Sequence, residues 1–506
     1  MEIQRWSTLL QSGNARNGIT CHRAVGNNGA RLYRKGMPLT RIHANLLNRR
    51  GRVASGLGLL FASALAGQQS QFQGSVPNGT ASSTPLALTL RDAIDRGLKT
   101  NLGLLVSGSA SEIARGQRLR ALSALMPQVG GQVSETVEQL NLKTIGFTFS
   151  IPGVALPSIV GPFQYTDLRA SASITVFDYN KWKNYRSYQE SQRAAQLSYR
   201  DARDVVVQAV ANAYLQVTAD ASRAEAIRAQ VLTDQALYDR TVDQKKAGTS
   251  PGIDVLRSQV ELKTQQQRLL AQENQLAKDK LSLGRVIGLP SGQDFNIAEA
   301  VPYSALASIT QEEALRAALD QRPDYQSAKA LVRASEEAVR ATRAERYPTA
   351  GVTGDYGDVG PTIGNSHGTF TFVASLKFNI FDGGRISSDE IQAKATLKQR
   401  QDELADLGGQ IDFQVRAAFL DIQSAADQVA VAKSNLELAN ETLEQARDRF
   451  TAGVTDNIEV VQAQQSVASA NDNLIFALYA HNLAKVALAR ALGAAEQGIQ
   501  KFMEVK

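Results

Sequence analysis

The second half of this chain repeats the first, and no other feature restricts its possible folds as strongly. The phrase "KKAGTSPGIDVLRSQV" at residues 245–260 returns as "FTAGVTDNIEVVQAQQ" at residues 450–465. Within it, Ala247-Gly248 corresponds to Ala452-Gly453, and Asp254 corresponds to Glu459. A turn that is repeated together with its acid is predicted to be used twice in one assembly.

The repeat covers most of the chain. Pro127 corresponds to Pro348, and from Val210 and Val415 onward the offset between the halves is constant. The first half is longer just after its proline, which predicts a longer surface loop there because loops tolerate insertions. Each half is expected to hold a helix, a β-hairpin and a long helical pair. The predicted divisions are residues 86–288 and 310–493 for the two structural repeats, 289–309 for a connector and 494–506 for a C-terminal tail.

After each proline, apolar residues alternate with period two, which is typical of strands with one apolar face. These residues are Ile145, Phe147, Phe149, Ile151, Leu168, Ala170, Ala172, Ile174 and Val176 in the first half, and Phe370, Phe372, Ala374, Leu376, Phe378 and Ile380 in the second. Taken alone, the pattern fits a β-sandwich and a transmembrane sheet equally well. No further strand pattern is present to complete a sandwich, so a transmembrane sheet is the prediction.

Beyond each hairpin the apolar period changes to seven. In the second half the heptad positions are Val415, Ala418, Ile422, Ala425, Val429, Ala432, Leu436, Ala439, Leu443, Ala446 and Phe450, followed by Val460, Ala463, Val467, Ala470, Leu474, Ala477, His481, Ala484, Leu488 and Ala491. Sustained heptads specify left-handed coiled-coil packing. The segments from Tyr179 to Lys246 and from Gly384 to Phe450 are therefore predicted to be helices on the order of 100 Å long.

These parts cannot close on themselves within one chain. A membrane-spanning sheet must close into a barrel, because open edges leave backbone groups unpaired in lipid. Two hairpins supply only four strands, whereas small barrels have about eight. Several copies are therefore predicted to share one barrel, and their long helices would continue its wall as a tube.

The first residues are predicted to direct export. A basic stretch that includes Arg49 and Arg50 precedes the apolar run "VASGLGLLFASALA", which ends in a small-x-small cleavage pattern. A transmembrane anchor is the alternative, but it needs about 20 apolar residues. We assign residues 1–66 to a targeting region with Met37 as the expected start of translation, and residues 67–85 to a flexible lead-in.

Once residues 1–66 are set apart, the net charge limits the possible partners and the cysteine count limits the possible disulfides and modifications. The whole chain has a net charge of +6, but residues 1–66 are strongly basic and the remainder is slightly acidic. Nucleic acid is therefore not an expected partner. The single cysteine, Cys21, lies upstream of the cleavage pattern, so the exported chain would hold no disulfide and no lipid-modified cysteine.

The order of these features resembles that of the TolC-type outer-membrane efflux proteins, the outer membrane factor family, over essentially residues 86–495. The resemblance rests on the helix ends "SALMPQV", "RAERYPTA", "RVIGL" and "RALGA", the turn "FDGGR" and the two repeated phrases. It implies a mainly α-helical chain with a small β-barrel part. Long antiparallel coiled-coil helices would form a trimeric α-barrel, and four β-strands per chain would contribute to a shared twelve-stranded transmembrane barrel. An equatorial region is also implied, with residues 289–309 and the tail as its candidates.

The same resemblance implies a function. The chain would be the outer-membrane exit duct of a tripartite efflux or type I secretion system in a Gram-negative bacterium, conducting substrates passively across the periplasm and the outer membrane. A homotrimer would contact outer-membrane lipid, a periplasmic adaptor protein and an inner-membrane pump, without a cofactor. A structural or adhesive surface coiled-coil protein without transport activity is the alternative.

The resemblance also assigns roles to the repeated turns. The tips predicted to dock the adaptor are Ala247, Gly248, Thr249, Ala452, Gly453 and Val454. At the pore aperture, Glu459 corresponds to an inward carboxylate ring and Asp254 to an acid that helps to tie helices together. Phe450 and Thr455 replace a tyrosine and an arginine of the family, which predicts an aperture held by packing and by different polar contacts. The alternative is that both acids only favour the positive end of a helix dipole.

An enzyme is a further alternative, and the sequence argues against it. The run "GTSPG" matches the G-x-S-x-G elbow of serine hydrolases, which needs a buried strand before it and a histidine partner. Here a polar helix precedes Ser250, whose expected role is to cap a helix before Pro251. Beyond residue 66 the histidines are His367 and His481, too few for a histidine-based metal site. His481 lies at an apolar heptad position and is expected to be a packed polar residue.

Overall fold

The computed structural model describes residues 72, 74–144, 146, 157–298, 303–304, 309–455 and 457–502. The chain divides into two units, Met1–Leu65 and Ala66–Lys506, and the described residues all belong to the second. The predicted targeting region with Met37 and Cys21 lies outside the described residues. So do the alternating residues Ile145, Phe147, Phe149 and Ile151, much of the connector and the end of the tail.

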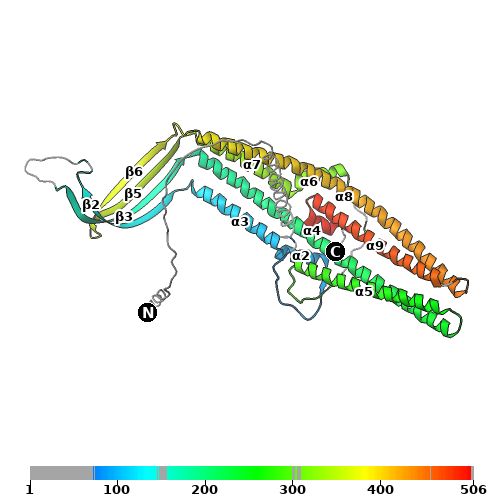
Figure 1. The fold of residues 1–506 in the computed structure, drawn as a ribbon. Coiled ribbons are helices and arrows are strands. Elements are labelled where there is room, and N and C mark those ends of the chain that lie inside the picture. Colours follow the sequence, from blue (N-terminus) through cyan, green and yellow to red (C-terminus); the bar gives the residue numbers. More distant parts are fainter. Residues whose placement is uncertain are drawn as a thin grey trace, which may run out of the picture. The chain divides into compact units, whose positions relative to one another are not determined.

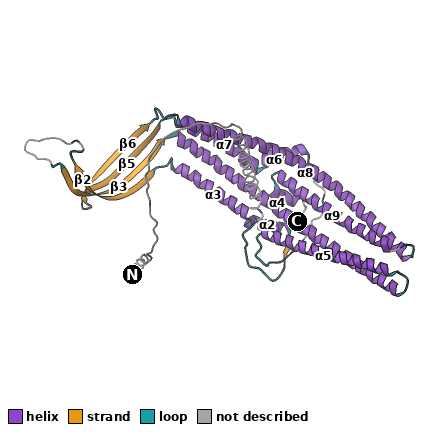
Figure 2. Cartoon of the chain, in the orientation of Figure 1, coloured by secondary structure: helices purple, strands orange, loops and turns teal. Residues whose placement is uncertain are grey.

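Each half contains helices, a hairpin and a long helical pair (Figures 1 and 2). The first half comprises α2 (Leu90–Thr100), α3 (Leu102–Ser123), β2 (Gln128–Asn141), β3 (Ile159–Phe177), α4 (Tyr179–Lys246) and α5 (Gly252–Val286). The second half comprises α6 (Gln311–Gln321), α7 (Pro323–Ala344), β5 (Thr349–Thr362), β6 (Asn365–Lys377), α8 (Arg385–Thr451) and α9 (Asn457–Ala491). The ends of the long helices α4 and α8 lie within one residue of the prediction.

Local signals explain where these helices begin. The Thr310 hydroxyl accepts a hydrogen bond from the backbone N–H of Glu313, and the Glu313 carboxylate accepts one from the Thr310 N–H. This capping box satisfies two donors that the first turn of α6 leaves free. The Asp178 carboxylate caps α4 by accepting from the Lys181 N–H at 3.0 Å. Because β3 ends at Phe177, the strand passes into α4 across a single residue.

The four longer strands form one antiparallel sheet in the order β2-β3-β5-β6. On one face, alternate residues are large and apolar: Leu168, Phe370 and Phe372 are 50%, 79% and 70% exposed in the single chain. The opposite face is polar, and there Arg169 of β3 forms ion pairs with Asp167 and with Asp355 of β5. The predicted alternation of β3 and β6 is confirmed.

Two details of the sheet bear on the predicted loops. The β2–β3 connection spans residues 142–158, whereas β5 and β6 are joined by residues 363–364, so the longer loop of the first half is confirmed. The prediction that Phe378 and Ile380 continue the last strand is wrong. β6 ends at Lys377, opposite Thr349, because β5 begins there and offers no partner beyond it.

The helices follow the same order as the strands (Figure 1). In sequence, α3 leads into β2, β3 into α4, α7 into β5 and β6 into α8. In space, α4 packs between α3 and α7, and α7 also packs against α8. Farther from the sheet, α5 takes the place of α3 beside α4, and α9 takes the place of α7 between α4 and α8. The chain therefore has two open edges, one formed by β2, α3 and α5 and the other by β6 and α8.

Most of the predicted heptad positions of α8 and α9 are buried, and Leu436, Phe450 and Leu474 are half-buried, which confirms the coiled-coil pattern. Val415, Val429 and Val460 are at most 1% exposed. Alanines between the larger residues, such as Ala425 and Ala470, are also buried. Small side chains at these positions let the helix backbones approach while larger neighbours fill the gaps.

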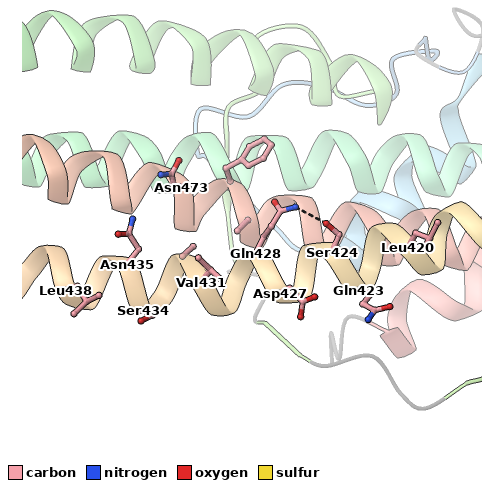
Figure 3. A pocket seen from close by; sticks show the side chains of 13 residues that line it. Leu420, Gln423, Ser424, Asp427, Gln428, Val431, Ser434, Asn435, Leu438 and Asn473 are labelled. Carbon is pink, nitrogen blue, oxygen red and sulfur yellow. Dashed lines mark hydrogen bonds between the residues drawn. The ribbon is translucent and has the colours of Figure 1, made fainter.

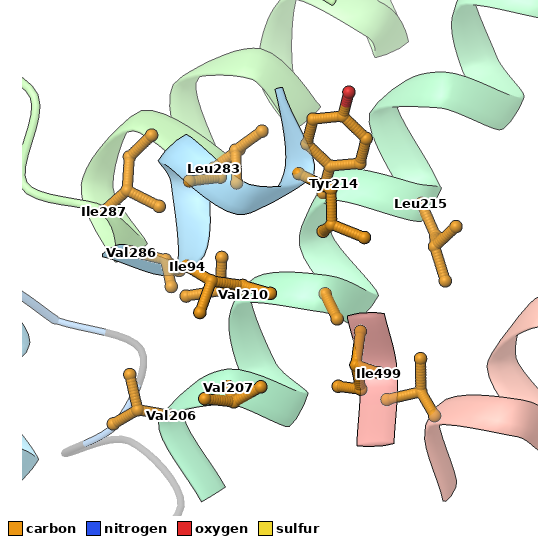
Figure 4. Packing of buried hydrophobic residues seen from close by; sticks show 14 of the residues in the cluster. Ile94, Val206, Val207, Val210, Tyr214, Leu215, Leu283, Val286, Ile287 and Ile499 are labelled. Carbon is orange, nitrogen blue, oxygen red and sulfur yellow. The ribbon is translucent and has the colours of Figure 1, made fainter. Parts of the chain in front are cut away.

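The largest core lies where α2, α4 and α5 meet the C-terminal helix α10 (Ala495–Phe502) (Figure 4). Val210 and Leu283 are fully buried there. A Cβ on Gly97 of α2 would lie 2.6 Å from Val210 Cγ2, so only glycine allows this approach to α4. Tyr214 is also fully buried, and its hydroxyl donates to the Leu88 carbonyl at 3.3 Å.

A second, two-stranded sheet was not predicted. β1 (Leu86–Leu88) pairs in parallel with β4 (Phe295–Ile297), so the inference that the chain has no further strands is wrong. Strands of three residues are too short to show a period-two pattern. Nearby, the buried Lys485 of α9 donates to Ser304 Oγ at 2.7 Å and to the Phe502 carbonyl at 3.0 Å. These bonds attach the described parts of the connector and the tail to α9.

Candidate functional site

A tight turn at residues 247–251 joins α4 to α5. Gly248 has φ = +76°, a left-handed conformation that favours glycine. The Gly248 N–H donates to the Lys245 carbonyl at 3.0 Å, and the Thr249 N–H donates to the Gln244 carbonyl at 2.9 Å. This pair of bonds is the Schellman arrangement, which satisfies the last carbonyl groups of a helix.

The turn between α8 and α9 has the same construction. Gly453 has φ = +74°. Its N–H donates to the Phe450 carbonyl at 3.1 Å, and the Val454 N–H donates to the Arg449 carbonyl at 3.0 Å. The duplicated phrase therefore folds into two equivalent tips, each with its glycine at the residue that must be left-handed.

Both tips leave their backbone open. A Cβ built on Gly248 or Gly453 meets no atom within 4 Å. Val454 is 69% exposed, and Ala247, Thr249 and Ala452 are exposed as well. The structure thus gathers the six residues predicted to dock an adaptor into two equivalent turns, uncovered by the described part of this chain.

Asp254, the acid just past the first tip, is buried. It is 4% exposed, and its carboxylate accepts from the Ser250 hydroxyl at 3.0 Å and lies 3.4 Å from the Arg257 guanidinium. The prediction that Ser250 caps α5 is wrong, because Pro251 occupies the cap position and no side chain bonds to the first turn. Ser250 instead uses its hydroxyl as a donor to a charged acceptor, which makes the stronger kind of hydrogen bond.

Glu459, the corresponding acid past the second tip, reaches solvent. Its side chain is 38% exposed and lies 3.1 Å from the Arg449 guanidinium of α8. Phe450 is half-buried, and the Arg240 guanidinium of α4 lies 5.6 Å from the centre of its ring. Thr455 is half-buried. The structure brings all four predicted aperture residues to the tips but gives the two equivalent acids different surroundings.

Three polar contacts that were not predicted join the two hairpins near their tips. Asn457, fully buried, donates from Nδ2 to the Asp254 carbonyl at 3.0 Å. Arg240 donates to the Thr451 hydroxyl at 3.1 Å, and Gln465 donates to the Glu261 carboxylate at 3.0 Å. A signal for Asn457 existed, because it precedes Val460 by three residues and so falls on the apolar heptad stripe.

A buried carboxyl group lies farther along the same interface. Asp234 is 1% exposed; its Oδ1 accepts from Gln230 at 2.9 Å, and its Oδ2 has no hydrogen-bond partner among the described residues. Burial is the largest cause that raises the pKa of Asp234 to about 6, and the nearby charge of Glu261 acts in the same direction. The buried hydroxyls of Thr241 and Ser258, which lie 2.7 Å apart, join α4 to α5 within the first hairpin. The first hairpin and its contacts with the second are therefore more polar than the heptad pattern predicts.

The chemistry at the tips is that of exchangeable hydrogen bonds and ion pairs. Ser250 is bonded to a carboxylate and not to an imidazole. In the described part of the chain, no group of three or more His, Cys, Asp or Glu side chains is placed to hold a metal ion. None of the described helices contains a stretch long and apolar enough to cross a membrane.

A sheet with one exposed apolar face, continued by long helical pairs that end in open matched tips, defines a channel subunit of the outer membrane. The chain belongs to the outer membrane efflux protein family, whose sequence profile matches residues 104–289 and 314–494. The two matched segments fall on the two halves of the duplication.

Known relatives share this assignment. The toluene efflux pump outer membrane protein TtgC of Pseudomonas putida is 24% identical over 345 residues, which cover 64% of this chain and 68% of TtgC. OprJ of Pseudomonas aeruginosa is 27% identical over 331 residues, which cover 61% of this chain and 64% of OprJ. The CmeC outer membrane channel of Campylobacter jejuni has the same fold, with a TM-score of 0.70 at 15% identity over 84% of this chain and 92% of CmeC. These relatives are transport channels and not enzymes, and they do not support the adhesive alternative.

Proposed function

We propose that three copies of this chain form the exit duct of a tripartite efflux system. Each copy contributes four strands to a twelve-stranded barrel, and its helices continue the wall as a tube across the periplasm. The observation that carries this proposal is the shared order of strands and helices, with both edges open from the sheet to the tips. Joining two different edges of identical subunits produces a ring.

The two edges have the apolar surface that such contacts need. On the α8 edge, a groove of about 950 Å³ between α8 and α9 is lined by residues that include Leu420, Val431 and Leu438 (Figure 3). Exposed apolar residues also follow α5 on the other edge, where Val260 and Leu270 are 66% and 70% exposed. Contact between the edges of neighbouring copies would bury both sets.

The edges of the sheet can pair in the same way. Neighbouring strands are antiparallel throughout the order β2-β3-β5-β6. Consequently β6 of one copy and β2 of the next run in opposite directions, and pairing them leaves no unpaired backbone at the seam. Closure through three such seams requires no change in either hairpin.

The open tips indicate where partner proteins would bind the duct. We infer that the open turns at Gly248 and Gly453 contact a periplasmic adaptor, which links the duct to an inner-membrane pump. Relatives with this fold carry names that specify different cargoes, toluene for TtgC and cations for CusC of Escherichia coli. A passive duct that leaves selection to its pump accounts for this range.

The residues just past the tips would form the aperture of the duct. A ring of Glu459 side chains, one from each copy, would favour cations in the pore and resist full ionisation. Asp254 acts through its backbone, since its carbonyl receives the bond from Asn457. Phe450 and Thr455 would complete the closed wall, with Arg240 stacked on Phe450 in place of an ion pair.

The ring and its conduction can be tested together. Native mass spectrometry of the protein extracted in detergent should give the mass of three chains, and planar-bilayer recording of the same preparation should show channel openings. A stable monomer or dimer would contradict the ring. A trimer that never conducts would contradict the duct.

The docking role of the tips needs a separate test. Substituting Gly248 or Gly453 would strain the turn itself, because both have positive φ. Thr249→Arg with Val454→Arg instead adds bulk and charge at exposed side chains beside them. Export should be lost while trimers remain in the membrane, whereas Gln401→Arg, on the exposed surface of α8 far from the tip, should export normally. Undiminished export by the tip variant would contradict docking at these turns.

A further inference from the structure

The apolar face of the sheet ends where the helices begin. Its residues occupy the helix-proximal parts of the strands, from Leu168 to Val176 on β3 and from Phe370 to Leu376 on β6. Phe381, just beyond β6, is 90% exposed. In the proposed barrel this apolar band faces lipid, so its helix-proximal end marks the inner boundary of the membrane.

An aromatic cluster lies directly beyond this boundary. Tyr179, the first residue of α4, packs edge-to-face on Tyr347, with 5.8 Å between ring centres. One turn farther, Trp182 is 43% exposed and packs against Tyr185 at 6.1 Å. Trp and Tyr rings are enriched at this depth in membrane proteins because one end is apolar and the other forms hydrogen bonds.

Arg186 follows Trp182 by one turn, and its guanidinium lies 5.8 Å from the centre of the indole ring. No carboxylate pairs with it in the described part of the chain. Glu190, the acid one turn away on the same helix, is bound instead by Arg333 at 2.8 Å. Arg186 is therefore an exposed cation held on an aromatic face with its charge uncompensated.

Several of the described cations around Arg186 on α4, α7 and α8 are paired with carboxylates. Lys183 pairs with Glu337 at 2.9 Å, and Lys181 lies 3.9 Å from Asp178. The remaining pairs in this region are Arg340–Glu337, Arg343–Glu390, Arg346–Glu390, Lys394–Glu390 and Arg385–Glu345. Arg186 combines an exposed charge that is not part of these pairs with contact to an aromatic ring, and this combination makes it a place for an external anion.

We propose that Trp182 and Arg186 form a binding site for an anionic phospholipid headgroup in the inner leaflet of the outer membrane. The indole would lie among the upper acyl chains, and the guanidinium would pair with the lipid phosphate. The site lies within three turns of the end of β3, next to the proposed lipid-facing surface of the sheet, which favours a lipid over a soluble anion. This inference rests on the proposed barrel, because the barrel sets the depth of the membrane.

Contact between subunits does not explain the free arginine. The ring closes through the open edges, whereas α4 is flanked in its own chain by α3 and α7. The exposed stripe of α4 that carries Trp182 and Arg186 therefore remains uncovered when the edges meet.

The location of Trp182 can be read from its fluorescence. The chain has two tryptophans, Trp6 and Trp182, so the variant Trp6→Phe reports on Trp182 alone. After reconstitution into phosphatidylcholine vesicles, lipids brominated near the headgroup end of the acyl chain should quench its emission more than lipids brominated near the tail end. Quenching by aqueous iodide without quenching by either lipid would place Trp182 in the water-filled lumen and overturn the proposal.

The role of Arg186 is tested by lipid preference. In vesicles that mix phosphatidylglycerol with phosphatidylcholine, the protein should enrich phosphatidylglycerol around Trp182, measured by quenching with the brominated anionic lipid. Arg186→Gln should reduce this enrichment about fivefold, the effect of one interfacial cation. Arg193→Gln removes an equal charge from an exposed position two turns farther from the sheet and should have no effect.

The possible results separate this inference from the proposed function. Protein that neither inserts nor conducts would contradict the barrel and with it the headgroup site. Protein that inserts and conducts, but shows equal enrichment with and without Arg186, would contradict the headgroup site alone. If inorganic phosphate at the lipid's concentration shifts the Trp182 emission as strongly as phosphatidylglycerol does, the site binds soluble anions and the lipid assignment is wrong.

Discussion

Asp254 and Glu459 occupy equivalent positions in the duplicated turn, yet the chain uses them differently. A second position near each acid also differs, because Asn457 in the second tip corresponds to Gly252 in the first. At this position only the second tip has a side chain that can cross to the other hairpin, and it binds the Asp254 carbonyl at 3.0 Å. Because of this difference, the second tip is hydrogen-bonded through Asn457 to the first hairpin.

Asn457→Ala removes the hydrogen bond between the second tip and the first hairpin. A buried hydrogen bond contributes on the order of 1 kcal/mol, so the open state of the aperture should become several-fold more populated. Single-channel recording would show this as a higher open probability. Asn440→Ala, which removes the same side chain from an exposed position on α8, should leave gating unchanged. If both variants gate like the parent protein, the bond does not hold the aperture closed.

Glu459→Gln tests the proposed carboxylate ring. Three neutral amides in place of three acids should lower cation selectivity and weaken block by divalent cations. Bilayer recording with and without a divalent cation measures both. The control is Glu437→Gln, an exposed acid of α8 farther from the tip. Unchanged selectivity and unchanged block would show that Glu459 does not line the constriction.

At the scale of the helices, the contacts within the second hairpin differ from those between the hairpins. Apolar heptad layers pack α8 against α9, whereas Asn457 and Glu261 take part in polar contacts between the two hairpins. Polar layers cost more to bury and less to separate than apolar ones.

Asp234 makes this interface sensitive to pH. Its pKa of about 6 in the folded chain exceeds the value of about 3.9 expected in the unfolded chain, so the folded state holds its proton more tightly. The stability that this proton contributes is present below about pH 4 and is lost as pH rises through about 6. Arg447 and Glu261 are the charged groups that face Asp234 from α8 and α5.

Asp234→Asn should therefore stabilise the hairpins near neutral pH and shrink the difference in Tm between about pH 4 and about pH 7. Thermal melting followed by circular dichroism measures both quantities. Asp239→Asn, an exposed acid of the same helix, should retain the pH dependence of the parent protein. An equal pH dependence in all three proteins would show that Asp234 titrates normally.

Regular features of this chain could be predicted from its sequence, and irregular ones could not. Heptads located α8 and α9 because one apolar stripe recurs over many turns, and Gly248 and Gly453 located the tips because few residues adopt positive φ. The contact of Arg240 with Phe450 depends on how two hairpins are placed relative to each other, which no local pattern encodes. Ser250 was assigned a cap because capping is the common role of serine before a helix, while its nearby acid offered a stronger partner.

At the scale of the whole molecule, the sheet must present one face to lipid and the other to water. Phe372→Asp places a charge on the exposed apolar face of β6, where a charged side chain is destabilising near the membrane midplane. Thr371→Asp places the same charge on the opposite face, beside the polar group of Arg169 and Asp355. Membrane fractionation should show that assembled trimers are lost in the first variant and retained in the second. The reverse result would exchange the lipid and lumen faces.

The constant offset between the two helical pairs has a consequence for how relatives of this protein can vary in length. Both tips of every subunit must reach the same level if they are to meet one flat partner. An insertion in a single arm would leave that subunit uneven, and one that is not a whole number of heptads would turn the apolar stripe away from its neighbour. Relatives that descend from the duplicated ancestor can therefore adjust to a wider or narrower periplasm only by matched insertions or deletions of about seven residues in all four helical arms. The tubes of such relatives should differ in length by whole heptads.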